Sequence, residues 1–182
     1  MAAQPIPLSK LESMQNAFDV KEWAVRSMKR RGVDAVIWGM PLVSFDALRQ
    51  AYFRNGKAKY GDIIWWPKGS TWKNQSLTPN QSLRYMYIFA NTKDEGPIVL
   101  DLPAAANGSS FLGTIVDAWQ VPLTDVGFEG RGGKYLVLPP GYAGEVPTGY
   151  IPVRPKTYNT MIGIRSIGRA VRRRMNKKVT RW

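Results

Sequence analysis

Six short apolar runs, each bounded by turn-forming residues, constrain the fold of this chain most strongly. Segments such as Asn107-Gly108 and Pro139-Pro-Gly141 separate them. Short runs at this spacing predict a mainly β (α+β) fold of antiparallel coiled sheets, arranged as a sandwich or a partly open barrel. A parallel α/β fold is disfavoured because no strong helical segment stands between the runs. The runs are Ile63–Trp66, Tyr85–Phe89, Ile98–Leu102, Phe111–Trp119, Tyr135–Leu138 and Met161–Ile164.

The segment before these runs, residues 1–57, is predicted to be helical and to pack on the β-rich region, residues 58–165. Asp19 is a candidate N-cap for a helix that runs to Arg31 and ends at Gly32. Pro41 lacks an amide hydrogen, so a helix must start, kink or stop there. Helical spacing resumes in residues 42–53.

Positive charge is concentrated at the C-terminal end. The net charge is +13. Residues 165–182 contain 8 Lys and Arg residues and no Asp or Glu, whereas residues 1–164 contain 18 Lys and Arg residues and 13 Asp and Glu residues. Residues 166–182 are interpreted as a basic amphipathic tail that attaches electrostatically to nucleic acid or an anionic membrane and is dispensable for folding. Its cations are Arg169, Arg172, Arg173, Arg174, Lys177, Lys178 and Arg181.

The chain contains neither cysteine nor histidine. This composition rules out disulfides, Cys/His zinc sites, cysteine nucleophiles and histidine-based triads, and we expect no metal and no organic cofactor. The sequence shows no signal peptide and no apolar run long enough to span a bilayer. As it stands the chain reads as cytoplasmic, and it would be periplasmic or secreted if a leader had been removed.

Six ordered motifs from about residue 33 to residue 165 resemble the domain-of-unknown-function 1254 family. They are Ala35-Val-Ile-Trp-Gly-Met-Pro-Leu-Val43, Leu77-Thr-Pro-Asn80, Gly96-Pro-Ile-Val-Leu-Asp-Leu-Pro103, Val116-Asp-Ala-Trp119, Gly132-Gly-Lys-Tyr-Leu-Val-Leu-Pro-Pro-Gly141 and Met161-Ile-Gly-Ile-Arg165. The resemblance implies an all-β region with helical additions, normally followed by a second, jelly-roll-like β domain. The family carries no settled activity. This chain resembles a half-length or truncated member, and it reads Asn80-Gln-Ser-Leu83 where members often read Asn-Asn-Asp-Thr.

Acid–base chemistry without histidine requires carboxylate, lysine or tyrosine groups with shifted pKa values. The catalytic candidates are Asp117, Lys134, Tyr135 and Arg165, and the candidate ligand contacts are Asn80, Arg84 and Trp119. Each also has a structural interpretation: a buried strand carboxylate is usually paired, and a strand arginine usually forms an ion pair.

The leading interpretation is a β-rich binding or assembly module with no catalytic motif. The alternative is a hydrolase or lyase acting on a carbohydrate or another small polar ligand. A pocket uniting Asp117 and Arg165 with Tyr135 or Lys134 would favour the enzyme, whereas a filled core would favour the module. The module would self-associate or bind a partner β domain through exposed aromatic residues, for which Trp65, Trp66, Trp72 and Tyr87 are candidates.

Overall fold

The first major element is one long helix. The computed structural model describes residues 7–10, 20–66, 83–168 and 179–181, the last range by its backbone. Helix α2, Val20–Asn55, continues through Gly32, Gly39 and Pro41. The predicted helix end at Gly32 is therefore wrong, while the predicted cap Asp19 lies outside the described residues. The helix continues although glycine costs about 1 kcal/mol in a helix interior and proline about 3 kcal/mol.

The chain divides into two compact units at the proline of this helix. They are Met1–Met40 and Pro41–Trp182. The second unit joins the C-terminal part of α2 to all the described strands. Gln120 donates its side-chain amide to the Pro41 carbonyl at 2.7 Å, which ties the first residue of this unit to the turn after β4.

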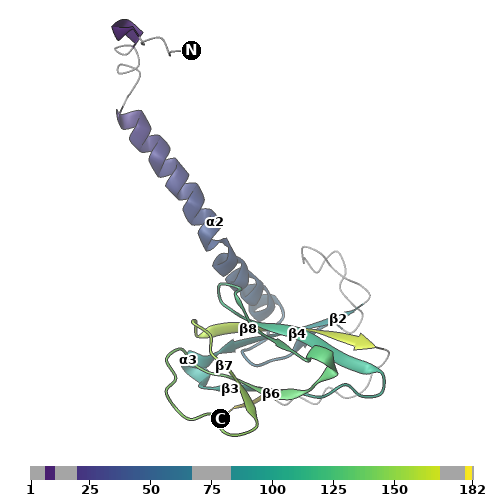
Figure 1. Cartoon of the computed structure of the whole chain (residues 1–182). Helices are drawn as coiled ribbons and strands as arrows, with labels where there is room; N and C mark the ends of the chain where they lie inside the picture. The colour runs from purple at the N-terminus through teal and green to yellow at the C-terminus, as the bar shows by residue number, and fades with distance from the viewer. Residues whose placement is uncertain (1–6, 11–19, 67–82, 169–178, 182) are drawn as a thin grey trace, which may run out of the picture. The chain divides into compact units, whose positions relative to one another are not determined.

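Within the described residues, the second unit contains two sheets that face each other (Figure 1). The five-stranded sheet has the order β1-β2-β8-β4-β5, and all its pairs are antiparallel. Its strands are β1 Ile64–Trp65, β2 Arg84–Asn91, β4 Ser109–Asp117, β5 Pro122–Val126 and β8 Asn159–Gly168. The four-stranded sheet has the order β7-β6-β3-β9. Its strands are β3 Ile98–Leu102, β6 Gly133–Val137, β7 Tyr150–Val153 and β9 Val179–Arg181.

The mainly β fold predicted from the sequence is confirmed, with one difference in strand direction. β6 and β7 are parallel, whereas the sequence predicted antiparallel sheets. The 12-residue segment between them, residues 138–149, crosses back along the sheet and permits this pairing. The short helix α3, Thr92–Glu95, and the 3-10 turn η1, Phe128–Gly130, complete the described elements.

The main core lies between the two sheets. Alternate residues of β2, β4 and β8 meet residues of β3, β6 and β7, as the period of two in a strand requires. The buried members of this core are Met86, Ile88, Leu100, Leu102, Ile115, Val126, Tyr135, Val137, Val153, Ile162 and Ile164. Gly127, at φ 73°, carries the chain from one sheet to the other, and a Cβ there would lie 2.1 Å from the Phe111 carbonyl oxygen.

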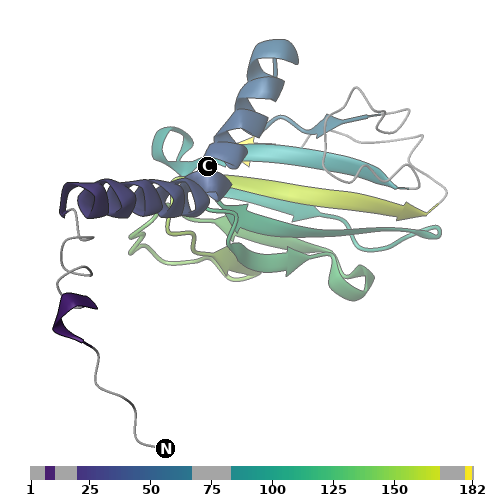
Figure 2. The same ribbon diagram turned by 90° about the horizontal axis from the view of Figure 1, so that it is seen from above.

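The opposite face of the five-stranded sheet packs against the part of α2 that follows Pro41, as the view from above shows (Figure 2). Phe45 of the helix, Phe89 of β2 and Ala118 after β4 are buried together there. Burial of such aromatic side chains stabilises a fold by roughly 1.5–3 kcal/mol each. This packing stabilises the part of the helix that follows Pro41 and so offsets the local cost of the proline.

The C-terminal region contains more strand than expected. β8 continues to Gly168, and β9 pairs with β3 through the register Ile98↔Arg181 and Leu100↔Val179. Of the predicted tail cations, only Arg181 belongs to a described segment, and the others, residues 169–178, lie outside the described residues. Across the part of the chain that is described, no helix meets the length and hydropathy needed to cross a membrane.

Candidate functional site

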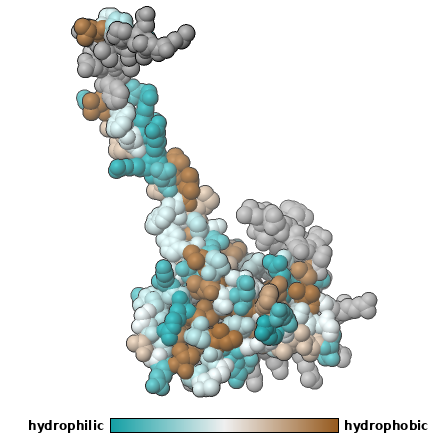
Figure 3. Space-filling model, in the orientation of Figure 1, coloured by the Kyte–Doolittle hydropathy of each residue, from teal (hydrophilic) through white to brown (hydrophobic). Residues whose placement is uncertain are grey.

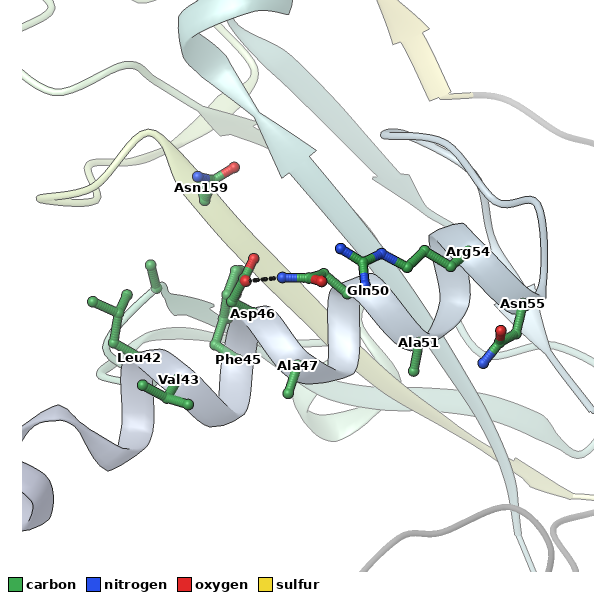
Figure 4. Close-up of a pocket in the computed structure, with 11 residues that line it drawn as sticks. Leu42, Val43, Phe45, Asp46, Ala47, Gln50, Ala51, Arg54, Asn55 and Asn159 are labelled. Carbon is green, nitrogen blue, oxygen red and sulfur yellow. Dashed lines mark hydrogen bonds between the residues drawn. The ribbon is translucent and has the colours of Figure 1, made fainter.

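A pocket of about 790 Å³ lies along the C-terminal part of α2 (Figure 4). Helix residues form most of its wall, and Ala118 and Asn159 contribute from the ends of β4 and β8. Asp46, Gln50 and Arg54 follow one another at intervals of four residues, so they lie along one side of the helix. Val43, Ala47 and Ala51 form a second row at the same interval, whose small side chains leave the space open.

Asp46 is an ionised and fully engaged carboxylate. Arg49 donates to its Oδ1 from Nε at 3.0 Å and from Nη2 at 2.6 Å, and Gln50 donates to its Oδ2. These bonds from Arg49 and Gln50 hold the pKa of Asp46 below its ordinary value of 3.8. Since a general acid must carry a proton near neutral pH, Asp46 is unsuited to that role.

The far side of Arg49 packs against aromatic rings. Its guanidinium lies 5.3 Å from the ring centroid of Phe53 and 5.9 Å from that of Tyr60. The Tyr60 hydroxyl in turn donates to Asn159 Oδ1 at 3.2 Å. A chain of contacts therefore joins Asp46 to Asn159 and fixes two polar residues of the pocket wall.

The Asp117 carboxylate stabilises the turn at one end of this pocket by accepting hydrogen bonds from backbone amides. Its Oδ1 accepts from the amides of Trp119 at 2.9 Å and Val121 at 3.1 Å, which closes the turn between β4 and β5. Ala118 within this turn donates its amide to Thr157 Oγ1 at 2.9 Å and lines the pocket. Asp117 is thus placed as a turn residue whose carboxylate holds Ala118 in position.

The other three catalytic candidates lie elsewhere in the fold. Tyr135 is buried between the sheets, where its hydroxyl accepts from the Gly127 amide at 3.3 Å. The Lys134 ammonium lies 5.8 Å from the Tyr150 ring centroid on the four-stranded sheet. Arg165 lies over the ring of Tyr85 at 5.8 Å.

The sheet register separates Asp117 from Arg165. Asp117 pairs with Thr160, and Arg165 pairs with Leu112. The two positions on β8 are therefore five residues, or about 16 Å, apart. The structure brings none of the four candidates together in one pocket.

The candidate ligand contacts are also dispersed. Arg84 begins β2, and Trp119 lies in the turn after β4, whereas Asn80 lies outside the described residues. Trp66 and Tyr87 pack with Tyr52 in an aromatic cluster, with centroid separations of 5.7 and 6.2 Å from the Tyr52 ring. Four aromatic residues were expected to be exposed. Trp65 is exposed, Trp66 and Tyr87 are half-buried, and Trp72 lies outside the described residues.

Exposed large apolar side chains are instead most frequent on α2, and many of them belong to the unit that ends at Met40. Val33, Val36, Ile37 and Met40 recur at the i, i+3, i+4 and i+7 positions of a helix and form what is called here the α2 stripe. Their exposed fractions are 58%, 68%, 61% and 55%. Figure 3 shows the apolar surface along the helix in brown.

Sequence reasoning identified neither the pocket nor the α2 stripe. Most of the pocket residues belong to a helix and carry no motif of a known site. The sequence pattern that could have indicated the pocket is the spacing of four within its two rows, Asp46, Gln50, Arg54 and Val43, Ala47, Ala51. The described residues contain no group of three or more acidic side chains close enough to share a metal ion.

The comparisons with known proteins concern the fold. The family model described as "Protein of unknown function (DUF1254)" matches residues 61–173. The chain is similar to the crystal structure of the VPA0106 protein from Vibrio parahaemolyticus, with a TM-score of 0.58 and 13% identity. That match covers 75% of this chain and 32% of the other, so this chain spans about a third of the length of the solved protein. No curated protein matches the chain.

Proposed function

Because the chain belongs to the DUF1254 family of proteins of unknown function, we propose that it is an assembly module within that family, and that the α2 stripe docks a further β domain. The observation that carries this proposal is the exposure of all four stripe residues. Each is an apolar side chain of ordinary core type, and each is more than half exposed. Apolar side chains at core spacing are normally covered by another element.

Two features indicate what kind of partner would bind the α2 stripe: the charge beside the stripe and the greater length of the VPA0106 protein. Lys29, Arg30 and Arg31 directly precede the stripe, so a matching surface would combine an apolar groove with an acidic rim. The VPA0106 chain has about two thirds of its length outside the match. The family resemblance implies that a jelly-roll-like β domain normally accompanies this region. A β domain, on the same polypeptide or on another, is therefore the proposed occupant.

A binding role also agrees with the placement of the candidate catalytic groups. Asp117 and Tyr135 are engaged in backbone contacts, and Arg165 lies about five strand residues away from Asp117. Nothing in this arrangement concentrates acid and base groups around one open space. The assembly interpretation is favoured over the hydrolase or lyase on this ground.

Photo-cross-linking from the stripe tests the proposal. A photoreactive phenylalanine replaces Ile37 in the full chain in its source cells, and the cross-linked peptides are identified by mass spectrometry. The control carries the same group at Lys93, an exposed position on α3. We expect position 37 to cross-link to one β domain, and Val33→Glu to abolish that product. Cross-links from position 37 that match those from position 93, or that join two copies of this chain, would refute the proposal.

A further inference from the structure

The pocket along α2 presents a net positive charge to a ligand. Both oxygens of Asp46 are occupied by Arg49 and Gln50, so the charge of this carboxylate is already balanced. Arg54 also lines the pocket; its charge acts on Asp46 through space, but among the described residues it forms no ion pair or hydrogen bond. One guanidinium is therefore left to receive an anion.

A second donor stands at the other end of the pocket. Asn159 Oδ1 accepts a hydrogen bond from the Tyr60 hydroxyl. The side-chain NH2 group of Asn159 is therefore the part of this amide that can still donate to a ligand. Among the described residues, that nitrogen has no hydrogen-bond acceptor. The bond from Tyr60 fixes the side chain, so this donor is held in place before any ligand arrives.

The remainder of the wall is apolar except for Asn55. Leu42, Val43, Ala47, Ala51 and Ala118 line the space between and beside these donors. A volume of about 790 Å³ falls within the range of pockets that hold small molecules, which are typically apolar with few polar groups. The lining thus favours a ligand that carries one anionic group on a short apolar body.

We infer that this pocket binds small aliphatic monocarboxylates. The carboxylate pairs with Arg54, whose planar guanidinium matches a carboxylate in two parallel hydrogen bonds. The aliphatic chain lies against Ala47 and Ala51. A polar substituent on the chain would reach Asn159. This inference is independent of the proposed docking function, because the α2 stripe shares no residue with the pocket.

Calorimetric titration of the full chain with hexanoate tests the inference, with hexan-1-ol and hexylamine as probes of the same chain length. Hexanoate should bind at least tenfold more tightly than either. Arg54→Gln should weaken hexanoate binding about tenfold or more, because a charge-assisted hydrogen bond is lost. Lys93→Gln, which removes an exposed cation outside the pocket, is the matched control and should leave binding unchanged.

Filling the pocket provides a second test. Ala47→Leu and Ala51→Leu each place a larger side chain in the open space and should abolish binding while circular dichroism shows an intact helix. Ile37→Gln on the α2 stripe should leave hexanoate binding unchanged, which separates this inference from the docking proposal. Equal binding of hexanoate and hexan-1-ol, an Arg54→Gln variant that binds normally, or no binding at all would overturn the inference.

Discussion

Tyr52 of α2 stacks on Tyr87 of β2, with ring centroids 6.2 Å apart and ring planes 24° apart. The pair joins the helix to the five-stranded sheet beside the buried Phe89 ring. Burial raises the pKa of the Tyr52 hydroxyl to about 12, and burial also raises that of Tyr87. The contact between helix and sheet therefore depends on two neutral phenols.

Alkaline pH should weaken this contact. The unfolded chain releases the Tyr52 proton near pH 10, whereas the folded chain retains it until about pH 12. Between these values the unfolded state binds fewer protons, so the free energy of unfolding falls as pH rises. We expect Tyr52→Phe to flatten that fall in urea titrations from pH 9 to pH 12. Tyr158→Phe, which removes an exposed hydroxyl, is the control, and an equal effect of both variants would refute the assignment.

The ring of Phe89 should be the most costly aromatic group to remove from this interface. It is 1% exposed and contacts Phe45, Tyr52 and Phe53. Phe89→Ala should lower the free energy of unfolding by about 3–5 kcal/mol. Phe128→Ala, at an exposed position, should change it by less than about 0.5 kcal/mol. A Phe89→Ala loss below about 1 kcal/mol would contradict the described packing.

Asp117 should behave as a structural residue. Asp117→Ala removes the acceptor for the Trp119 and Val121 amides and should cost about 1–3 kcal/mol in chemical unfolding. Asp117→Asn keeps an acceptor oxygen at the same place and should recover most of this loss. A variant pair with equal stability would show that the carboxylate does not close the turn.

The C-terminal segment should contribute to the four-stranded sheet as well as to charge. Deleting residues 169–182 removes β9, so β3 becomes an edge strand, and amide exchange at residues 98–100 should accelerate.

The same deletion tests the sequence-based expectation that the tail attaches to nucleic acid. That expectation gives a dependence of log binding constant on log salt concentration with a slope of about −7 at most on duplex DNA, which the deletion should reduce strongly. Unchanged amide exchange would argue against the β9 pairing, and unchanged DNA binding would argue against the tail.

Much of the sheet structure was predictable because its strands carry their own pattern. The run Ile98–Leu102 coincides with β3, and the other five runs fall on β1, β2, β4, β6 and β8. β5 and β7 were missed, and so was β9, which falls in the segment predicted to be a tail. β5, Pro-Leu-Thr-Asp-Val, carries two polar residues in its middle, and β7, Tyr-Ile-Pro-Val, is interrupted by a proline, so neither gives a continuous apolar run. Both lie at sheet edges, where such residues are tolerated.

The course of α2 and the pocket could not be read in the same way. Local rules require a helix to start, kink or stop at Pro41, yet α2 continues past it, and its next turn packs Phe45 against Phe89. Arg54 lies on this helix, whereas Ala118 and Asn159 come from the ends of β4 and β8, more than sixty residues away in the sequence. The register of β4 against β8, with Asp117 opposite Thr160, brings these two strand ends together beside the helix.

Binding of a neutral hydrophobic dye tests the central proposal, a bare docking stripe on α2, most directly. Nile red is uncharged, so the positive charge of the chain does not attract it. We expect the isolated chain to enhance its emission, and a variant with Gln at positions 33, 36, 37 and 40 to lose most of that signal while keeping its helix, since Gln favours helices. The control carries Val121→Gln and Phe128→Gln, two exposed apolar positions outside the stripe. An isolated chain that binds no dye, or a stripe variant that binds as much as the control, would contradict the proposal.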